Sequence, residues 1–331
     1  MMEELEPTAN ELSETRTRRQ GAATVVEEPS HEAARERRAA AAELVDSGGL
    51  YEVIELLGAG GMGEVYRARD RRLGREVAVK VLPSARGLDE RALRRLEQEA
   101  RTVASLSHPN IVAVHDLQIE EGTAYAVMEL LHAQNLRARL RRGPLPAGEC
   151  IEYARGIAAG LRAVHDQGII HRDLKPENLF ITASGLVKIL DFGIAKRSPC
   201  ELASGDADAL LTVPGELIGT VAYMSPEQVR AAPLDTRSDL FSFGVVLVEM
   251  LSGQRPFHKD SGAETMAAIL RDPPAGLHAA RLASPALARI ARRCLQKEPG
   301  DRHRDTAELV ADLCAIRAPK PPGRPEPRRP R

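Results

Sequence analysis

The sequence predicts an α+β protein of two lobes, a small β-rich lobe followed by a larger helical lobe, with a ligand cleft between them. Before residue 130, apolar and polar residues alternate around a glycine cluster at 58–63, which is typical of an antiparallel sheet. After residue 131, apolar residues recur at helical spacing. We therefore expect a folded region over 48–316, with the lobes at 48–130 and 131–316.

The small lobe is expected to contain five strands and one helix. The helix begins after Asp89, which is a good N-cap residue, and continues to Leu106. Its buried stripe would include Glu99, since Leu96, Glu99 and Val103 follow helical spacing. The expected strands lie at 51–57, 64–68, 76–81, 111–119 and 124–129.

The larger lobe is expected to be mostly helical. Helical patterns occupy 135–142, 147–167 and most of 222–316. Two short strands around 179–182 and 187–190 interrupt them. Outside the folded region, residues 1–47 form a charged extension with an acidic excess, and residues 317–331 form a tail rich in proline and arginine. Neither end has a hydrophobic pattern that would favour a packed fold.

Composition excludes several classes of protein. The net charge of -1 gives no argument for a nucleic-acid partner. The chain has no run of 18 apolar residues, so no membrane span is expected, and its first residues do not resemble a secretory signal. The four cysteines form no CxxC pair, which argues against a zinc site or a disulfide framework. These features together favour a cytoplasmic protein.

The glycine cluster is the first candidate binding motif. Gly58, Gly60 and Gly63 have the spacing G-x-G-x-x-G, in which backbone amides approach phosphate oxygens closely. Dinucleotide-binding folds share this spacing, but there the loop leads from a strand into a helix. Here residues 64–68 have β character, which favours a hairpin that covers phosphates.

Lys80 and Glu99 form a candidate charge pair. Lys80 ends the apolar strand Val77-Ala-Val-Lys80 and would project into the cleft. The alternative is an exposed lysine at a sheet edge. A carboxylate within the buried stripe of the following helix needs a partner, and Lys80 is the obvious one.

Two further motifs establish a family resemblance. They are His171-Arg-Asp-Leu-Lys-Pro-Glu-Asn178 and Asp191-Phe-Gly193. With the glycine cluster, the Lys80 strand, Glu99 and Ser225-Pro-Glu227, they stand in the order typical of protein kinases. The chain resembles this family from about residue 50 to 316, most of all its bacterial (eukaryotic-like) serine/threonine kinases. The resemblance implies the two-lobed protein kinase fold with ATP in the cleft.

The resemblance also implies a role for each catalytic residue. Asp173 would orient the acceptor hydroxyl, and Lys175 would neutralise charge on the transferred phosphoryl group. Asn178 and Asp191 would hold Mg²⁺, with Mn²⁺ as an alternative metal. Lys80, held by Glu99, would bind the inner phosphates of ATP, and Thr220 would contact Asp173 and Lys175.

The ATP site implied by the resemblance combines the glycine hairpin with an apolar adenine pocket. Met128 would guard the back of the pocket, and the connecting segment from Glu129 to Leu131 would recognise adenine through its backbone. For Met128, packing in the core is the alternative. The residues expected to contact ATP, besides Lys80, are Leu57, Gly58, Ala59, Gly60, Gly61, Met62, Gly63, Glu64, Val65, Ala78, Met128, Glu129, Leu131 and Phe180.

Three residues are expected to be structural. By resemblance, Glu227 and Arg302 form a buried ion pair, and Asp239 anchors the catalytic loop. Ser225 stands where most of the family has alanine, which is a change between small residues.

The implied function is transfer of the γ-phosphoryl group of ATP to serine or threonine hydroxyls of protein substrates. Two alternatives remain open, a scaffold that shares the fold without transferring phosphate and a small-molecule kinase. By resemblance, Lys175 favours serine and threonine as acceptors, because tyrosine kinases usually lack a lysine at this place. A small-molecule kinase would not need Gly219-Thr220, Lys175 and Ser225-Pro-Glu227 together. We further expect another copy of the enzyme to phosphorylate Thr212, whose phosphate would pair with Arg172. The alternative is an unmodified loop residue.

Overall fold

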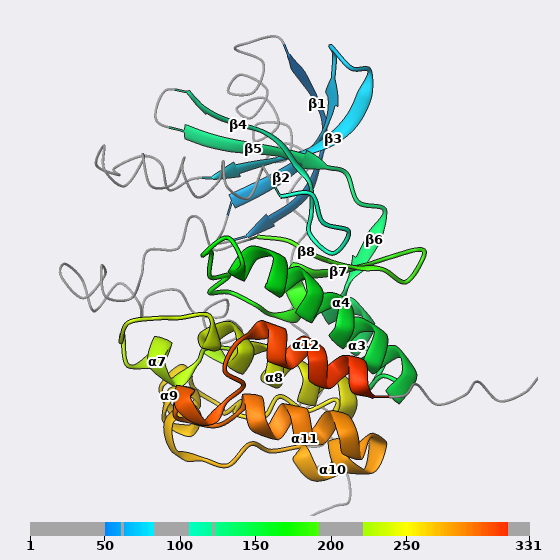
Figure 1. The fold of residues 1–331 in the computed structure, drawn as a ribbon. Helices are drawn as coiled ribbons and strands as arrows, with labels where there is room; N and C mark the ends of the chain where they lie inside the picture. Colours follow the sequence, from blue (N-terminus) through cyan, green and yellow to red (C-terminus); the bar gives the residue numbers. More distant parts are fainter. Residues whose placement is uncertain (1–49, 61–62, 83–105, 121–122, 192–220, 317–331) are drawn as a thin grey trace, which may run out of the picture.

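The computed structural model describes residues 50–60, 63–82, 106–120, 123–191 and 221–316. Within these ranges a twisted sheet stands above a helical body, and a short three-stranded sheet lies where the two meet (Figure 1). This arrangement confirms the predicted α+β fold with a β-rich lobe and a helical lobe. The extension at 1–47, the tail at 317–331 and nearly all of the helix expected at 89–106 lie outside the described residues.

The small lobe is one antiparallel sheet with the strand order β1-β2-β3-β5-β4. Strand β3 lies in its centre and pairs with β2 on one side and β5 on the other, so Lys80 sits opposite Val65 and Ala126. Central placement buries both faces of β3, which explains its apolar run. The strands are β1 (Tyr51–Gly60), β2 (Gly63–Asp70), β3 (Arg75–Leu82), β4 (Val114–Glu120) and β5 (Thr123–Glu129).

The prediction of a strand at 111–119 was wrong about where the strand begins. Strand β4 starts only at Val114, and Ile111 forms a parallel bridge with Ile189 in the other lobe. The amide of Val112 donates to the carbonyl of Ile189 at 3.0 Å, and the amide of Ile189 donates to the carbonyl of Asn110 at 2.9 Å. An apolar run such as Ile111–Val112 suits a strand in either sheet, so pattern alone does not choose between them.

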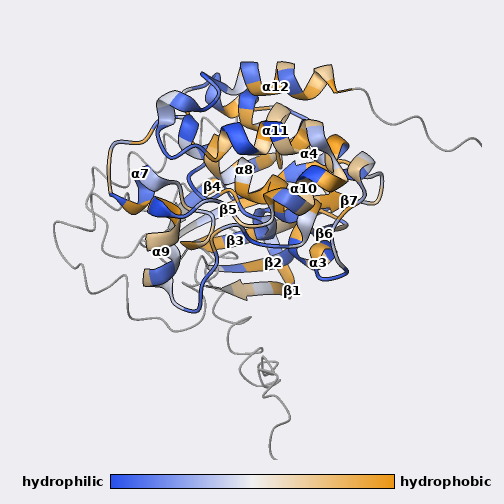
Figure 2. Cartoon of the chain, turned by 90° about the horizontal axis from the view of Figure 1, so that it is seen from below, coloured by the Kyte–Doolittle hydropathy of each residue, from blue (hydrophilic) through white to orange (hydrophobic). Residues whose placement is uncertain are grey.

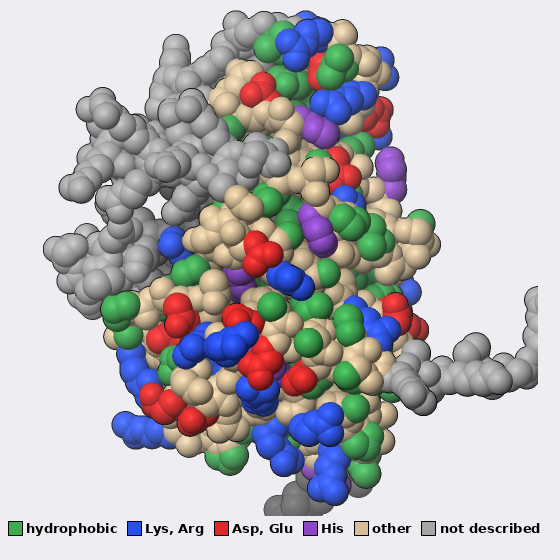
Figure 3. All heavy atoms as spheres, in the orientation of Figure 1, with side chains coloured by type: hydrophobic (Ala, Val, Ile, Leu, Met, Phe, Trp, Pro, Cys, Tyr) green, Lys and Arg blue, Asp and Glu red, His purple; other side chains and the backbone are tan. Residues whose placement is uncertain are grey.

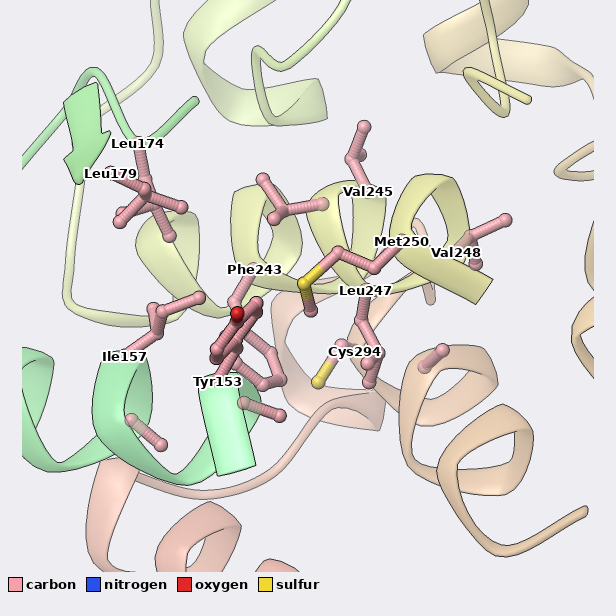
Figure 4. Packing of buried hydrophobic residues seen from close by; sticks show 14 of the residues in the cluster. Tyr153, Ile157, Leu174, Leu179, Phe243, Val245, Leu247, Val248, Met250 and Cys294 are labelled. Atoms are coloured by element: carbon pink, nitrogen blue, oxygen red, sulfur yellow. The ribbon is translucent and has the colours of Figure 1, made fainter. Parts of the chain in front are cut away.

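The helical lobe is built around α8 (Arg237–Ser252). Every residue of α8 from Ser238 to Leu251 is buried, because α4, α10 and α11 pack around it. Figure 4 shows Phe243 of α8 at Tyr153 of α4 and Leu247 of α8 at Cys294 of α11, all within one hydrophobic cluster. The helix ends at Gly253, whose φ of 72° favours glycine. The other helices are α3 (Leu136–Leu140), α4 (Ala147–His165), η2 (Pro176–Asn178), α7 (Pro226–Val229), α9 (Gly262–Arg271), α10 (Leu277–Ala283), α11 (Pro285–Cys294), η4 (Pro299–Asp301) and α12 (Thr306–Ala315).

A second sheet lies between the lobes. Its strands are β6 (Ala133–Asn135), β7 (Leu179–Thr182) and β8 (Val187–Ile189), paired antiparallel in that order. The last two match the predicted short strands, whereas residue 135 was predicted to begin a helix and instead ends β6. Its side chain caps α3 by accepting from the amide of Ala138 at 2.8 Å. A three-residue strand has too few positions to show a period of two.

In Figure 2, α11 and α12 both carry hydrophobic and hydrophilic residues. The apolar residues that these helices bury in the core include Leu287, Ile290 and Leu309. In the view of Figure 3, acidic and basic side chains both lie over this lobe. None of the helices in the described ranges has the length and apolar character needed to cross a bilayer.

Candidate active site

The glycine cluster forms a β-hairpin, as predicted. Gly58 pairs with Val65, Ala59 with Glu64, and Gly60 with Gly63. A shift in register after Leu56 adds a bulge, and Gly63 has a φ of 113°, which a residue with a side chain rarely adopts. Leu57, Gly58 and Ala59 are exposed. Gly61 and Met62, expected to contact ATP, lie outside the described residues.

Lys80 joins the small lobe to Asp191, the first residue of the motif that was predicted to bind metal. Its Nζ lies 2.6 Å from Oδ1 of Asp191, and its side chain is only 10% exposed. Asp191 has a φ of 55°, in the left-handed region, so its position at the end of β8 is constrained by its surroundings. The expected partner Glu99 lies outside the described residues, so that pairing stays a prediction.

Three predicted catalytic residues meet on the loop between α4 and β7. Lys175 Nζ lies 3.2 Å from Oδ2 of Asp173. The Nδ2 atom of Asn178 donates to the same Oδ2 at 3.1 Å and to the carbonyl of Asp173 at 2.9 Å. All three side chains are almost fully buried, which holds them in one geometry. Thr220, which was expected to join them, lies outside the described residues.

The loop is anchored from below by Asp239 of α8, as expected by resemblance. Its carboxylate accepts from the amides of His171 at 2.7 Å and Arg172 at 2.9 Å. Burial alone would raise the pKa of Asp239, but its hydrogen bond with His165 at 2.8 Å and these contacts lower it. An ionised Asp239 therefore supports the backbone of Arg172, whose φ of 65° is otherwise unfavourable.

A small apolar cluster lies beside Lys80, where adenine is expected. Ala78, Val112 and Met128 are buried in it, and Val65 and Leu131 pack against them. Val112 was not predicted, because it lies before β4 and far in sequence from the other members. Phe180, half-buried on β7, is not among the residues that pack in this cluster.

The side chain of Glu129 makes structural contacts within the protein. Its Oε1 accepts from the amide of Ala113 at 2.8 Å and from Nζ of Lys188 at 2.5 Å. The amide of Glu129 also donates to the carbonyl of Ala113 at 2.9 Å. Lys188 lies on β8, so this ion pair joins the two lobes behind the apolar cluster. Any contact of Glu129 with adenine would therefore use its carbonyl.

The start of α7 is tied to the catalytic loop through Gln228. The Oγ of Ser225 accepts from the amide of Gln228 at 3.2 Å, and the Gln228 side chain accepts from the amide of Ser225 at 2.9 Å. This reciprocal pair is a capping box. Gln228 also donates to the carbonyl of Arg172 at 2.8 Å. Replacement of alanine by serine at 225 thus adds a cap, which its size alone did not indicate.

The ion pair of Glu227 and Arg302 is present and buried. The guanidinium contacts both carboxylate oxygens, at 2.7 and 2.9 Å, and Ser238 donates to Glu227 at 2.6 Å. Burial opposes ionisation of Glu227, but the Arg302 hydrogen bonds lower its pKa overall.

The donor set fits a divalent metal that is shared with phosphate. Across the described ranges, no three His, Cys, Asp or Glu residues come together in a way that would hold a metal alone. Asn178 keeps its Oδ1 free of the two hydrogen bonds that its Nδ2 makes, and Asp191 supplies a carboxylate. Mg²⁺ commonly takes one or two protein oxygens and completes its shell with phosphate and water.

Comparison with known proteins agrees with this geometry. The profile of the protein kinase domain matches residues 51–312. Serine/threonine-protein kinase PknB of Mycobacterium leprae is 39% identical over 284 residues, which are 83% of this chain and 44% of the relative. Serine/threonine-protein kinase pkn3 of Myxococcus xanthus is 38% identical over 275 residues, 80% of this chain and 50% of the relative. The chain thus spans about half the length of these curated relatives.

Solved structures give the same result. The kinase domain of PknI from Mycobacterium tuberculosis superposes with a TM-score of 0.62 and 25% identity, covering 80% of this chain and 96% of that domain. A single mutant of the same domain gives a TM-score of 0.61 and 26% identity, with coverage of 80% and 95%. With the profile match and the bacterial relatives, these findings show that the chain belongs to the protein kinase family, among the bacterial serine/threonine kinases.

Proposed function

We propose that this chain is an active, cytoplasmic serine/threonine protein kinase that transfers the γ-phosphoryl group of ATP to protein hydroxyls with Mg²⁺ as the metal. The observation that carries the proposal is the contact of Asp173 with Lys175 and Asn178, at 3.2 and 3.1 Å. A scaffold that had lost activity would have no need to keep this buried ion pair, because replacing such a pair by apolar residues is often neutral or even stabilising.

Each side chain has a separate task in this proposal. Asp173 accepts a hydrogen bond from the acceptor hydroxyl and orients it toward the phosphorus. Lys175 places positive charge beside the transferred group, and Lys80 binds the inner phosphates. When bound at Asn178 and Asp191, Mg²⁺ neutralises charge on the phosphate oxygens. Lys80 then exchanges its contact with Asp191 for a phosphate.

The test is incorporation of labelled phosphate from ATP with Mg²⁺ into the protein itself and into a basic protein substrate. Asp173→Asn and Lys80→Met are each expected to lower the rate at least about 100-fold, because they remove charges that act on the reacting groups. Asp166→Asn and Lys259→Met make the same chemical changes at sites with partly exposed side chains, 63% and 47%, and are expected to retain activity.

Phosphoamino acid analysis separates the three candidate functions. Label on serine or threonine that disappears in both active-site variants supports the kinase. Bound ATP without incorporation favours the scaffold, and label on a free metabolite alone favours a small-molecule kinase.

We also propose that a second copy phosphorylates Thr212 and that Arg172 binds the phosphate. Thr212 lies outside the described residues. In support, Nε of Arg172 is buried and lacks a hydrogen-bond partner within the described part of the chain. A buried donor without a partner is costly, so a phosphate would relieve that cost. Phosphopeptide mapping that finds Thr212 unmodified in fully active enzyme would contradict this proposal.

A further inference from the structure

Three buried polar side chains connect α12 with the catalytic loop. The Oγ1 atom of Thr306, the first residue of α12, lies 2.5 Å from Nδ1 of His165 at the end of α4. The other ring nitrogen of His165, Nε2, lies 2.8 Å from Oδ2 of Asp239 on α8. These contacts thus join three helices that are far apart in the sequence.

Asp239 continues the connection into the backbone of the catalytic loop. The Oδ2 atom that contacts His165 also accepts from the amide of His171, and Oδ1 accepts from the amide of Arg172. Arg172 has a left-handed backbone conformation and directly precedes Asp173. The position of the Asp239 carboxylate therefore determines where the backbone next to Asp173 lies.

Water has little access to these contacts. The side chains of His165 and Asp239 are 5% and 1% exposed, and Thr306 is 3% exposed. A buried ring nitrogen that loses its partner cannot bond to water instead, so the loss is costly. The hydroxyl of Thr306 is the group that faces Nδ1 of His165.

The carboxylate fixes the direction of the hydrogen bonds. Burial raises the pKa of Asp239, but its hydrogen bond with His165 and its other contacts lower it overall, so Asp239 is ionised. A carboxylate only accepts, so Nε2 of His165 carries a hydrogen and donates to it. A neutral ring then has Nδ1 as an acceptor, and the Thr306 hydroxyl donates to it. The same hydroxyl accepts from a protonated ring, so it holds the ring in either form.

Capping of α12 does not explain a threonine at this position. The N-cap is Asp305, whose side chain accepts from the amide of Glu308 at 2.9 Å. Threonine is a weak helix former, because its branched side chain loses rotamer freedom in a helix. The contact with His165 therefore accounts for the hydroxyl at 306 better than the needs of the helix do.

Helix α12 is held against α4 at its other end as well. Arg155 of α4 donates from Nη2 to the carbonyl of Ile316 at 2.6 Å and from Nε to that of Leu313 at 3.3 Å. Leu309 and Leu313 of α12 belong to the hydrophobic core of the lobe. Because the helix is fixed along its length, Thr306 has a definite position from which to orient the ring.

We propose that Thr306 is a positioning residue for phosphoryl transfer, which acts through His165 and Asp239 to hold the catalytic loop in its active geometry. The hydroxyl fixes the imidazole ring, the ring orients the carboxylate, and the carboxylate holds the loop amides beside Asp173. The inference rests on the proposed kinase function and adds a residue outside the cleft to the groups on which the rate depends.

The experiment compares Thr306→Val, which keeps the shape of the side chain and removes the hydroxyl, with Thr306→Ser, which keeps the hydroxyl. In the full chain, Thr306→Val is expected to lower kcat about tenfold, because small displacements of the reacting groups are costly to the rate. The KM for ATP should change less than about twofold, since the glycine hairpin and Lys80 are not moved. Thr306→Ser should restore most of kcat. Unchanged kcat in Thr306→Val, or no recovery in Thr306→Ser, overturns the proposal.

Thr265→Val is the matched control for the loss of a buried hydroxyl. Thr265 of α9 is 0% exposed, and its Oγ1 accepts from the amide of Lys259 at 3.1 Å. Both valine variants should have a lower melting temperature, because each leaves one polar group without its partner. Only Thr306→Val should have the lower kcat at a temperature where both are folded. An equal loss of kcat in Thr265→Val would make the effect one of general stability and reject the proposal.

Nuclear magnetic resonance separates failure of this inference from failure of the proposed function. The nitrogen-15 resonance of Nδ1 in His165, assigned by its absence from His165→Gln, should shift in Thr306→Val and return in Thr306→Ser. The amide resonances of His171 and Arg172 should shift with it, and should stay in place in Thr265→Val. These shifts support positioning of the loop even in a protein that transfers no phosphate. Active wild-type enzyme with unchanged loop amides and unchanged kcat in Thr306→Val leaves the kinase standing and rejects the positioning role.

Discussion

The small and helical lobes are stabilised in different ways. In the helical lobe one continuous hydrophobic cluster extends across α4, α8 and α11, and buried ion pairs are embedded in it. In the described part of the small lobe, apolar residues form two separate clusters on opposite faces of one sheet. Ion pairs between described residues of this sheet are at least partly exposed, such as Arg71 with Glu52, whose side chains are 49% and 56% exposed. The helical lobe is thus the rigid support, and the small lobe brings Lys80 and the glycine hairpin to it.

The largest predicted effect comes from breaking a buried ion pair. Glu227→Gln leaves Arg302 charged and buried with one fewer anionic partner, and should lower the free energy of unfolding by about 3–5 kcal/mol. The Arg302 side chain is 0% exposed, so solvent cannot replace the lost carboxylate. Chemical denaturation followed by circular dichroism gives the value.

The matched control is Glu52→Gln in the small lobe, where the pair is exposed and water screens it. Its unfolding midpoint should stay close to that of the wild type. If both variants lose similar stability, the proposed difference between the lobes is wrong.

The next effect concerns the contact between the lobes. A Cβ on Gly160 of α4 would lie 2.8 Å from Cδ1 of Ile189 and 3.0 Å from the carbonyl oxygen of Asn110. Gly160→Val should therefore destabilise the protein by about 1–3 kcal/mol, because overpacking forces backbone shifts. It should also lower kinase activity, since Ile189 leads to Asp191. Gly148→Val, where a Cβ would meet nothing within 4 Å, is the control for valine in the same helix, and thermal melting compares the two.

A third prediction concerns the loss of stability at acidic pH. The pKa values of Glu227 and Asp239 are lowered in the folded protein from their ordinary values of 4.5 and 3.8. The folded state therefore binds fewer protons than the unfolded state, and the stabilisation present at neutral pH is lost as the pH falls below about 4.5. Urea unfolding at pH 7, 5 and 4 should show this decline, with a shallower dependence in Glu227→Gln. If the free energy of unfolding depends on pH equally in the wild type and in Glu227→Gln, the ionisation of Glu227 does not contribute to the loss of stability in acid.

The smallest effect is on the reactivity of cysteines toward alkylating reagents. The labelling rate of a buried cysteine reports how readily the lobe around it opens. Burial raises the pKa of Cys150 and of Cys294 to about 12, so neither provides the thiolate that alkylating reagents require. Cys314 is exposed and should react in the native protein, as measured by mass spectrometry of labelled peptides.

A cysteine placed at Val79, which is fully buried in β3, extends this measurement to the small lobe. Val79→Cys should be labelled sooner than Cys294, because the sheet opens with the loss of fewer buried contacts. Equal labelling rates would indicate that the two lobes unfold as one unit.

Much of the fold and site was predictable because local patterns and ordered motifs carried the information. The alternation of apolar and polar residues predicted β3, and the motif at 171–178 predicted that Asp173 and Asn178 would belong to one site. What the sequence could not predict depends on contacts between distant segments. Ile111 joins a strand of the other lobe, and Val112 enters the apolar cluster, for reasons that only the assembled fold provides. Likewise, nothing around Ser225 indicated that Gln228 would reach the carbonyl of Arg172.

The contacts between the lobes also meet at one short segment. The lobes are joined at the chain connection after Glu129 and again where Asn110 and Val112 bond to Ile189. The ion pairs of Glu129 with Lys188 and of Lys80 with Asp191 add two further contacts between the same lobes. Each of these contacts ends on the short stretch from Lys188 to Asp191 or on Ile189 within it. A substitution that shifts this stretch would therefore disturb the seat of the small lobe and the position of Asp191 together.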